Sequence, residues 1–263
     1  MKKEPIYMAF STQKGGVGKS AFTVLMASYL HYTKGYNVVV VDCDYPQFSI
    51  HAMRDRDKKL VETDDFYKRM AINQFSGLGK RAYPVLCSKP EDAIEVTKDM
   101  LDGCEGEYDI VFFDLPGTVN SQGVIESLSS LDYIFTPIIA DRVVMESSLR
   151  FASRINEVIV MNKSKRTKEI HLFWNQVDGR EKTDLYRIYE EGISTLGLQL
   201  MKTVIPDTKR FRKEMSCDHK LPFRSTLFPA DKRLLKGSNV EELIDEICSI
   251  IKLDGHEREN GQD

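Results

Sequence analysis

A short glycine-rich segment near the start of the chain carries residues suited to binding phosphate. Gly15, Gly16 and Gly18 allow backbone N–H groups to approach phosphate oxygens, and Lys19 and Ser20 add an ammonium and a hydroxyl. In loops of this kind the lysine reaches the β- and γ-phosphates of a nucleotide and the hydroxyl binds Mg²⁺. A helix that starts here would also favour an anion through its dipole. The predicted phosphate-binding residues are Gly15, Gly16, Val17, Gly18, Lys19, Ser20 and Ala21.

Carboxylates follow two apolar segments that are typical of buried parallel strands. Residues 38–41 are all valine and lead into Asp42 and Asp44, and residues 108–113 lead into Asp114. The carboxyl ends of parallel strands are where α/β sheets bind ligands. We therefore expect a Mg²⁺ site at this edge, formed by Ser20, Asp42, Asp44 and Asp114, with Asp114 holding the ion through water. A helix cap or a turn is the competing explanation for Asp42 and Asp44.

The chain that must position these residues alternates short β-branched runs with helical patterns, which is typical of βαβ units. Strands are expected over residues 6–11, 37–42, 85–88, 108–114, 133–137, 169–175 and 199–205. Helices are expected over residues 20–33, 90–102, 121–130, 141–162, 182–196 and 239–253. The pattern predicts one α/β domain over residues 1–254, a doubly wound, mostly parallel sheet in the three-layer, Rossmann-like arrangement of P-loop NTPases. Residues 255–263 are expected to be a disordered tail, and residues 54–81 are a polar insertion of unassigned form.

The composition excludes several classes of protein. Hydrophobic residues make up 41% and charged residues 29% of the 263, as in globular proteins, and no run of about 18 apolar residues could span a bilayer. The five cysteines are widely spaced and contain no Cys-x-x-Cys pair, so neither a zinc site nor a redox disulfide is expected. We expect a cytoplasmic protein with reduced thiols.

The residues just before the phosphate-binding segment narrow the prediction. The pattern G-x-x-x-x-G-K-[ST] would place glycine at position 13, where this chain has Gln13, and Lys14 adds a second positive charge. Lys14-Gly15-Gly16-Val17-Gly18-Lys19-Ser20 resembles the deviant Walker A motif of the ParA/MinD superfamily, in particular of its ParA-type partition ATPases. The resemblance implies an ATPase that uses ATP and Mg²⁺. It also implies a homodimer on ATP binding, in which Lys14 reaches the partner's phosphates and Lys19 binds those of its own subunit.

Further motifs extend the resemblance. Asp42-Cys43-Asp44-Tyr45-Pro46-Gln47 is similar to the Asp-x-Asp-Pro-Gln box of the superfamily, with Tyr45 as one extra residue. This similarity implies that Asp44 orients the attacking water, so the expected catalytic residues are Lys14, Lys19 and Asp44. Gly117 follows Asp114 closely, and its backbone amide is expected to sense the γ-phosphate.

The later half of the chain matches the superfamily at the positions that contact the nucleotide base. Asn175 corresponds to an asparagine that reads the adenine edge, and Pro206 and Asp207 correspond to a loop over the base. A purely structural role is the alternative for these three residues.

Charge is distributed unevenly near the end of the chain. Residues 202–236 hold ten basic and four acidic residues, whereas residues 237–263 hold two basic and eight acidic ones. ParA-like proteins bind DNA without sequence preference through late basic residues, and neutralising phosphate is the obvious use of the surplus. A solvated charged face is the alternative. The expected DNA contacts are Lys209, Arg210, Arg212, Lys213, Lys232, Arg233 and Lys236.

The resemblance implies partition of a plasmid or mobile element. An ATP-bound dimer would bind DNA on the nucleoid, and a centromere-binding or other activating protein would stimulate hydrolysis. Two alternatives stay open: a nucleotide-gated module that recruits a protein partner, and a MinD-like positioning ATPase. The latter would need a basic amphipathic helix, but the polar face of residues 239–253 is acidic, so no membrane binding is expected.

Overall fold

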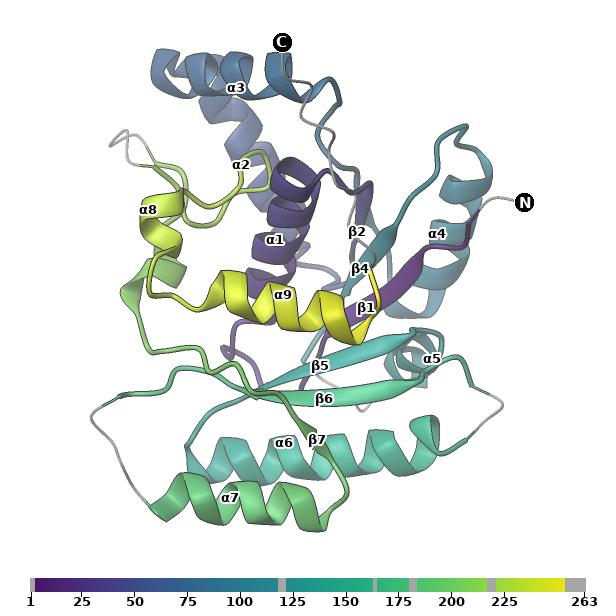
Figure 1. Cartoon of the computed structure of the whole chain (residues 1–263). Helices are drawn as coiled ribbons and strands as arrows, with labels where there is room; N and C mark the ends of the chain where they lie inside the picture. Colours follow the sequence, from purple (N-terminus) through teal and green to yellow (C-terminus); the bar gives the residue numbers. More distant parts are fainter. Residues whose placement is uncertain (1–2, 118–121, 163–164, 180–183, 217–220, 254–263) are drawn as a thin grey trace.

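A parallel sheet forms the centre of this computed structural model, which describes residues 3–117, 122–162, 165–179, 184–216 and 221–253. Within those residues its seven strands follow the order β3-β2-β4-β1-β5-β6-β7 (Figure 1). The strands are β1 (Ile6–Phe10), β2 (Val38–Asp42), β3 (Val85–Cys87), β4 (Ile110–Asp114), β5 (Tyr133–Ile138), β6 (Glu169–Trp174) and β7 (Gln199–Leu200). Every neighbouring pair is parallel, and the order reverses at β1. The predicted doubly wound α/β fold is confirmed.

Helices follow the strands as the sequence pattern indicated. They are α1 (Lys19–Tyr29), α2 (Ser49–Thr63), α3 (Asp65–Leu78), α4 (Ala93–Asp102), α5 (Gln122–Ser129), α6 (Arg142–Ile155), α7 (Asp184–Thr195), α8 (Lys232–Leu235) and α9 (Val240–Ile250). Shorter turns are η1 (Leu30–Lys34), η2 (Pro90–Asp92), η3 (Asn156–Val160) and η4 (Lys209–Arg212). All six expected helices are present within the described residues, with ends shifted by a few positions.

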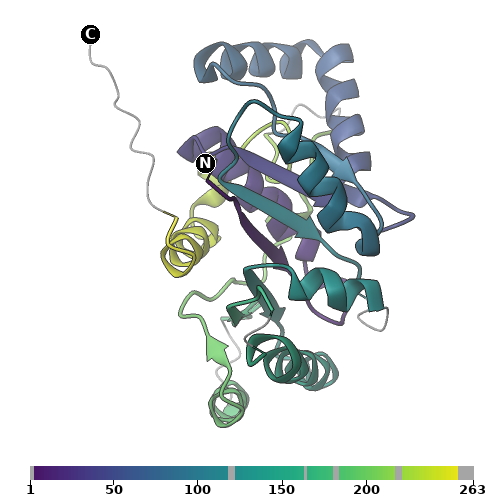
Figure 2. The same cartoon turned by 90° about the vertical axis from the view of Figure 1, so that its right-hand side faces the viewer.

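Successive side chains of the strands divide between two cores. In β1, Met8 and Phe10 pack in the core formed with α1 and α9, whereas Tyr7 and Ala9 pack in the core formed with α4 to α7 (Figures 1 and 2). Because both faces of the sheet are covered, the central strands are apolar without alternation. The register of β2 and β4 sets Asp42 opposite Asp114 at one edge of the sheet.

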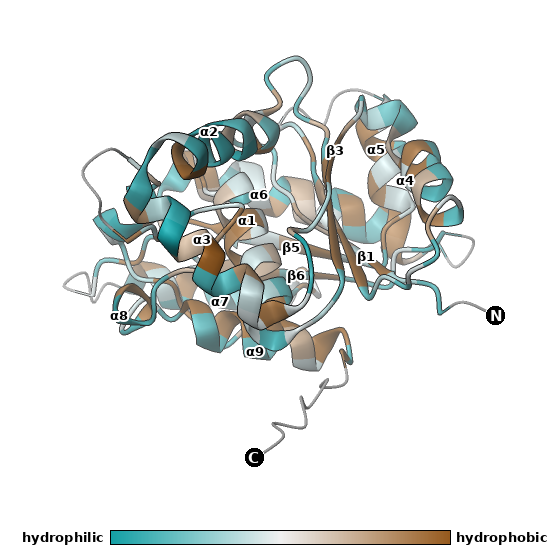
Figure 3. Ribbon diagram, turned by 90° about the horizontal axis from the view of Figure 1, so that it is seen from above, coloured by the Kyte–Doolittle hydropathy of each residue, from teal (hydrophilic) through white to brown (hydrophobic). Residues whose placement is uncertain are grey.

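The polar insertion is a pair of helices. Residues 54–81 fall mostly within α2 and α3, which the sequence did not assign. The reason is that α2 buries only Ile50, Met53, Arg54 and Asp57, so it lacks a clear apolar stripe (Figure 3). At the junction the Asp64 side chain accepts a hydrogen bond from the backbone N–H of Phe66 and caps α3. One strand was predicted too long: β7 is shorter than the strand expected over residues 199–205.

The amphipathic segment near the end of the chain forms α9 and packs on the sheet. Val240, Leu243, Ile244 and Ile247 are buried among residues of α1 and the strands. Among the helices of the described residues, none is both long and apolar enough to cross a membrane. The tail predicted over residues 255–263 lies outside the described residues.

Candidate nucleotide-binding site

The glycine-rich segment forms a loop between β1 and α1. Gly16 and Gly18 have φ of 77° and 92°, a left-handed conformation that glycine adopts without strain. Gly18 is the cap residue of α1, and its carbonyl accepts the hydrogen bond of the Phe22 N–H. Val17 between them is 2% exposed and anchors the loop. The N-terminal end of α1 therefore opens onto the loop, as an anion site requires.

The two lysines of the loop occupy different positions. The Lys19 ammonium donates a hydrogen bond to the Lys14 carbonyl at 3.3 Å, which folds the side chain back over the loop. Burial lowers the pKa of Lys19, and the nearby carboxylates of Asp114 and Asp44 oppose that shift. Lys19 therefore lies between the loop and the two acids. Lys14 is half-buried, and its expected contact with a second subunit stays a prediction.

Asp114 has the environment of a metal ligand. It is 1% exposed at the end of β4, and neither carboxylate oxygen has a hydrogen-bond partner among the described residues. Burial raises the pKa of Asp114 to about 7, against smaller opposing effects of the Ser20 hydroxyl and the Lys19 ammonium. A buried carboxylate without a partner is costly unless a cation compensates it. Asp114 and Ser20 therefore fit Mg²⁺, which one or two carboxylates, a hydroxyl and substrate phosphates commonly hold.

The described residues contain no group of three or more His, Cys, Asp or Glu side chains arranged to bind a metal on their own.

The Asp42 carboxylate holds the start of α2. Its Oδ2 accepts hydrogen bonds from the backbone N–H groups of Ile50 and His51 at 2.8 and 2.9 Å, and its Oδ1 accepts one from Asp44 at 3.3 Å. The structure thus gives Asp42 the capping role that was the competing explanation. Its support of Mg²⁺ stays a prediction.

Asp44 begins a tight turn that faces the loop. Its carbonyl accepts hydrogen bonds from the N–H groups of Gln47 and Phe48 at 2.8 and 2.9 Å. Phe48 closes the turn with a φ of 44°, which is uncommon for a non-glycine residue. The Asp44 carboxylate lies close enough to Lys19 and Asp114 to affect the pKa of each. The structure therefore brings Asp44 to the site, and its role with water stays a prediction.

Gly117 touches the phosphate loop. A Cβ atom at this position would lie 3.1 Å from the Lys19 Nζ atom and 3.5 Å from the Gly15 nitrogen. A side chain at position 117 would therefore disturb the position of the Lys19 ammonium in the loop.

The residues expected to contact adenine lie side by side. Asn175 is 4% exposed, and its Nδ2 donates a hydrogen bond to the Val17 carbonyl at 2.9 Å. Pro206 forms a bridge with Val177, and the Asp207 N–H donates to the Val177 carbonyl at 2.9 Å. Asn175 therefore braces the phosphate loop, and its reading of adenine stays a prediction, as do the base contacts of Pro206 and Asp207.

The expected DNA contacts lie on and near η4 and α8. The exposed ones are Lys209, Arg212, Lys213, Lys232, Arg233 and Lys236. Arg233 is paired with Asp231 at 3.0 Å. Arg210 is half-buried and donates hydrogen bonds to the carbonyls of Leu234 and Lys236, so its guanidinium joins η4 to the end of α8. The charges of Arg210 and Arg233 are thus partly used within the chain. The remaining exposed residues are the better candidates for contacts with DNA phosphates: Lys209, Arg212, Lys213, Lys232 and Lys236.

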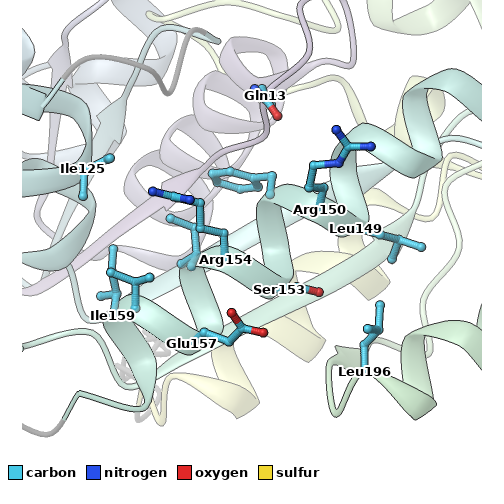
Figure 4. Close-up of a pocket in the computed structure, with 12 residues that line it drawn as sticks. Gln13, Ile125, Leu149, Arg150, Ser153, Arg154, Glu157, Ile159 and Leu196 are labelled. Carbon is cyan, nitrogen blue, oxygen red and sulfur yellow. The ribbon is translucent and has the colours of Figure 1, made fainter.

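A cavity of about 770 Å³ lies along α6 (Figure 4). Arg150, Arg154 and Glu157 line it together with Leu196, which follows α7. Gln13, which precedes Lys14, also lines the cavity, and none of the predicted site residues does. The cavity is therefore adjacent to the nucleotide site and distinct from it.

Comparison with known proteins agrees with this geometry. Residues 8–221 match the model of the CobQ/CobB/MinD/ParA nucleotide binding domain family. A search of curated protein sequences gives no significant match.

Three solved structures illustrate the similarity of fold. A plasmid partition protein of Borrelia burgdorferi B31 bound to AMPPNP is 18% identical, with a TM-score of 0.62 over 94% of this chain and 100% of that chain. The MinC:MinD cell division complex of Aquifex aeolicus is 15% identical, with a TM-score of 0.59 over 98% of this chain and 100% of that chain. The septum site-determining protein MinD of Pyrococcus horikoshii OT3 with Mg-ADP is 17% identical, with a TM-score of 0.58 over 97% and 100%.

Proposed function

This chain belongs to the family of CobQ/CobB/MinD/ParA nucleotide-binding domains, and we propose that it is an ATPase of the ParA type. In the proposed cycle, ATP joins two copies of the chain, the dimer binds DNA without sequence preference, and hydrolysis releases it. An activating partner, such as a centromere-binding protein, stimulates hydrolysis during partition of a plasmid or mobile element. The ATP-bound form is thus nucleoid-associated.

The observation that carries the proposal is the buried carboxylate of Asp114, whose oxygens accept no hydrogen bond within the described part of the chain, and which lies near Ser20 and Lys19 at the phosphate loop. In the proposed site Lys19 binds the β- and γ-phosphates, and Ser20 and Asp114 hold Mg²⁺, which neutralises phosphate charge when bound. Asp44 orients the attacking water. The Gly117 amide contacts the γ-phosphate and so distinguishes ATP from ADP.

Lys14 is the residue on which the proposed dimer depends. Two nucleotides that face each other concentrate negative charge, and a second lysine from each subunit would offset it in the transition state. A nucleotide-gated module without significant turnover would need Lys19 and Ser20 but not Asp44. A MinD-like membrane role is less well supported, because the apolar face of α9 is already buried against the sheet.

The DNA-binding part is tested by titrating a fluorescent duplex with the protein bound to Mg²⁺–AMPPNP or to Mg²⁺–ADP at several salt concentrations. We expect tighter binding with AMPPNP and a logarithmic salt slope that falls by about two in Arg212→Ala/Lys213→Ala, because two phosphate contacts are lost. Lys58→Ala/Lys98→Ala is the control, since both residues are exposed and lie on α2 and α4. An unchanged slope in the first variant would remove the assignment of this surface.

A further inference from the structure

A cluster of buried polar side chains joins α2 to a distant part of the chain. Arg54 and Asp57 are 6% and 0% exposed. Asp57 Oδ2 accepts hydrogen bonds from the Thr226 N–H at 2.8 Å, the Thr226 hydroxyl at 3.0 Å and the Ser225 hydroxyl at 2.9 Å. Arg54 donates to the Thr226 hydroxyl at 2.9 Å, the Thr226 carbonyl at 3.1 Å and the Tyr83 carbonyl at 2.9 Å. Both side chains thus converge on Thr226.

The first turn of α2 is fixed to the nucleotide site. Asp42 accepts hydrogen bonds from the N–H groups of Ile50 and His51, and it also accepts one from Asp44. Arg54 follows on the next turn of the same helix. A change in the position of the Asp44 turn would therefore move α2 as a rigid element.

The segment held by α2 is hydrogen-bonded to the segment that carries the basic residues. The N–H groups of Phe223 and Arg224 donate to the Lys213 carbonyl at 3.0 and 2.9 Å. Glu214 forms a bridge with Arg224 through the backbone and an ion pair through the side chains. Arg56 of α2 pairs with the same Glu214 at 2.5 Å. The backbone that carries Arg212 and Lys213 is thus attached to α2 at two places, through the Arg56–Glu214 ion pair and through the segment that includes Thr226.

We propose that Arg54 and Asp57 are positioning residues that couple the turn at Asp44, in the nucleotide site, to the basic segment around Lys213 through Thr226. This inference rests on the proposed function and deepens it, because it says how nucleotide state reaches the DNA-binding surface. Two sites couple when each biases the same two-state element, and here that element is α2 with the Ser225–Thr226 segment.

The chemistry of the cluster suits such a coupling. An apolar contact of similar area would tolerate small displacements of α2. A buried guanidinium and carboxylate with six directional hydrogen bonds do not, because each bond that is lost leaves a polar group unsatisfied. Movement of α2 must therefore carry Thr226 with it.

The test measures the dissociation constant for duplex DNA with Mg²⁺–AMPPNP and with Mg²⁺–ADP, and takes their ratio. Thr226→Val keeps the shape of the side chain but removes the hydroxyl that joins Arg54 to Asp57. Thr63→Val is the matched control, because Thr63 is exposed on the same helix and bonds only to a backbone carbonyl. Arg54→Lys is the second variant, with the exposed Arg69→Lys of α3 as its control.

We expect the ADP-to-AMPPNP ratio to fall by about fivefold or more in Thr226→Val and Arg54→Lys, within the usual range of couplings, and to stay at the wild-type value in both controls. The affinity of each variant for AMPPNP itself should equal that of the wild type. A protein that was merely destabilised would bind the nucleotide more weakly. If the wild type has a large ratio and both variants keep it, the inference is wrong and the proposed function stands. If the wild type itself has a ratio near one, both are wrong.

Hydrogen exchange of the wild type provides a test that needs no variant. The amides of residues 223–226 should exchange more slowly with AMPPNP than with ADP, because the segment is held by α2 in the ATP-bound position. Equal exchange in the two nucleotide states would overturn the coupling.

Discussion

Gly117 combines a sequence motif with a close contact that only the structure reveals. Gly117 lies against the ammonium of Lys19, and a Cβ atom added to Gly117 would come within 3.1 Å of the Lys19 Nζ atom. We predict that Gly117→Ala weakens AMPPNP binding about tenfold more than ADP binding, because the proposed contact of the Gly117 amide is with the γ-phosphate, which ADP lacks. Calorimetric titration of both nucleotides measures the difference.

Gly192→Ala is the control for this substitution. Gly192 lies in α7, and a Cβ atom there would meet nothing within 4 Å. Its replacement should leave both affinities unchanged. Equal weakening of AMPPNP and ADP by Gly117→Ala would argue against a γ-phosphate sensor.

His31 in η1 gives the protein a defined dependence on pH. It is 5% exposed, and its Nε2 lies 2.9 Å from the Arg81 carbonyl. Burial lowers the pKa of His31 to about 4, although the Arg81 carbonyl opposes the shift. In the unfolded chain the histidine pKa is about 6.5. Between about pH 4 and pH 6.5 the unfolded chain therefore binds a proton at His31, and the folded chain does not. The free energy of unfolding should fall as pH decreases through this window, by about 2 kcal/mol after solvent screening.

His31→Gln isolates this contribution. The glutamine amide can still donate to the Arg81 carbonyl but does not titrate. Asp114 titrates in the same range with the opposite sign, and that effect is common to both proteins. Urea unfolding between about pH 7.5 and pH 4.5 should give a variant that loses less stability than the wild type. Parallel curves would show that His31 is not responsible.

The residues of the site differed in how well the sequence could predict them. The sequence pattern predicted that Lys19, Ser20 and Asp114 lie together, and the structure brings them together, while their roles toward phosphate and Mg²⁺ stay predictions. The capping role of Asp42 depends on α2, and the internal contacts of Arg210 depend on α8, which follows it after more than 20 residues. Such contacts between separate elements leave no local pattern.

At the scale of elements, strands were more predictable than the insertion. The central strands β1, β2 and β4 are buried and almost entirely apolar, so their apolar runs predicted them directly. The edge strands β3 and β7 are short and not buried, and β7 forms only part of the strand predicted over residues 199–205. Helix α2 buries two charged side chains where an apolar stripe would be expected, so its sequence is typical of a solvated segment. The contacts of Arg54 and Asp57 with Thr226 account for its burial.

The packing of α9 leads to a prediction at the same scale. Ile247 is fully buried in the core shared with α1. We predict that Ile247→Ala lowers the free energy of unfolding by about 2–5 kcal/mol, through lost burial and a residual cavity. Ile188→Ala on α7, where the side chain is 54% exposed, should change it by less than about 0.5 kcal/mol. Chemical denaturation measures both, and a neutral Ile247→Ala would mean that α9 detaches from the sheet.

At the scale of the whole molecule, the sheet order places the ends of β1, β2 and β4 together, which brings the phosphate loop, Asp42 and Asp114 to one edge. The topology follows from the βαβ pattern and was predictable. The attachment of the basic segment to α2 was not, because it joins residues about 170 positions apart. The proposed role of Lys14 extends further still, because it involves a second copy of the chain.

The central claim, that each ATPase site is completed by a second copy, is tested most directly by mixing two inactive variants and measuring phosphate release. Lys14→Ala lacks the lysine given to the partner, and Asp44→Asn lacks the carboxylate used in its own site. A mixed dimer has one complete site, so an equimolar mixture should recover about a quarter of the wild-type rate, although each variant alone is inactive. A mixture as inactive as its components would contradict the account.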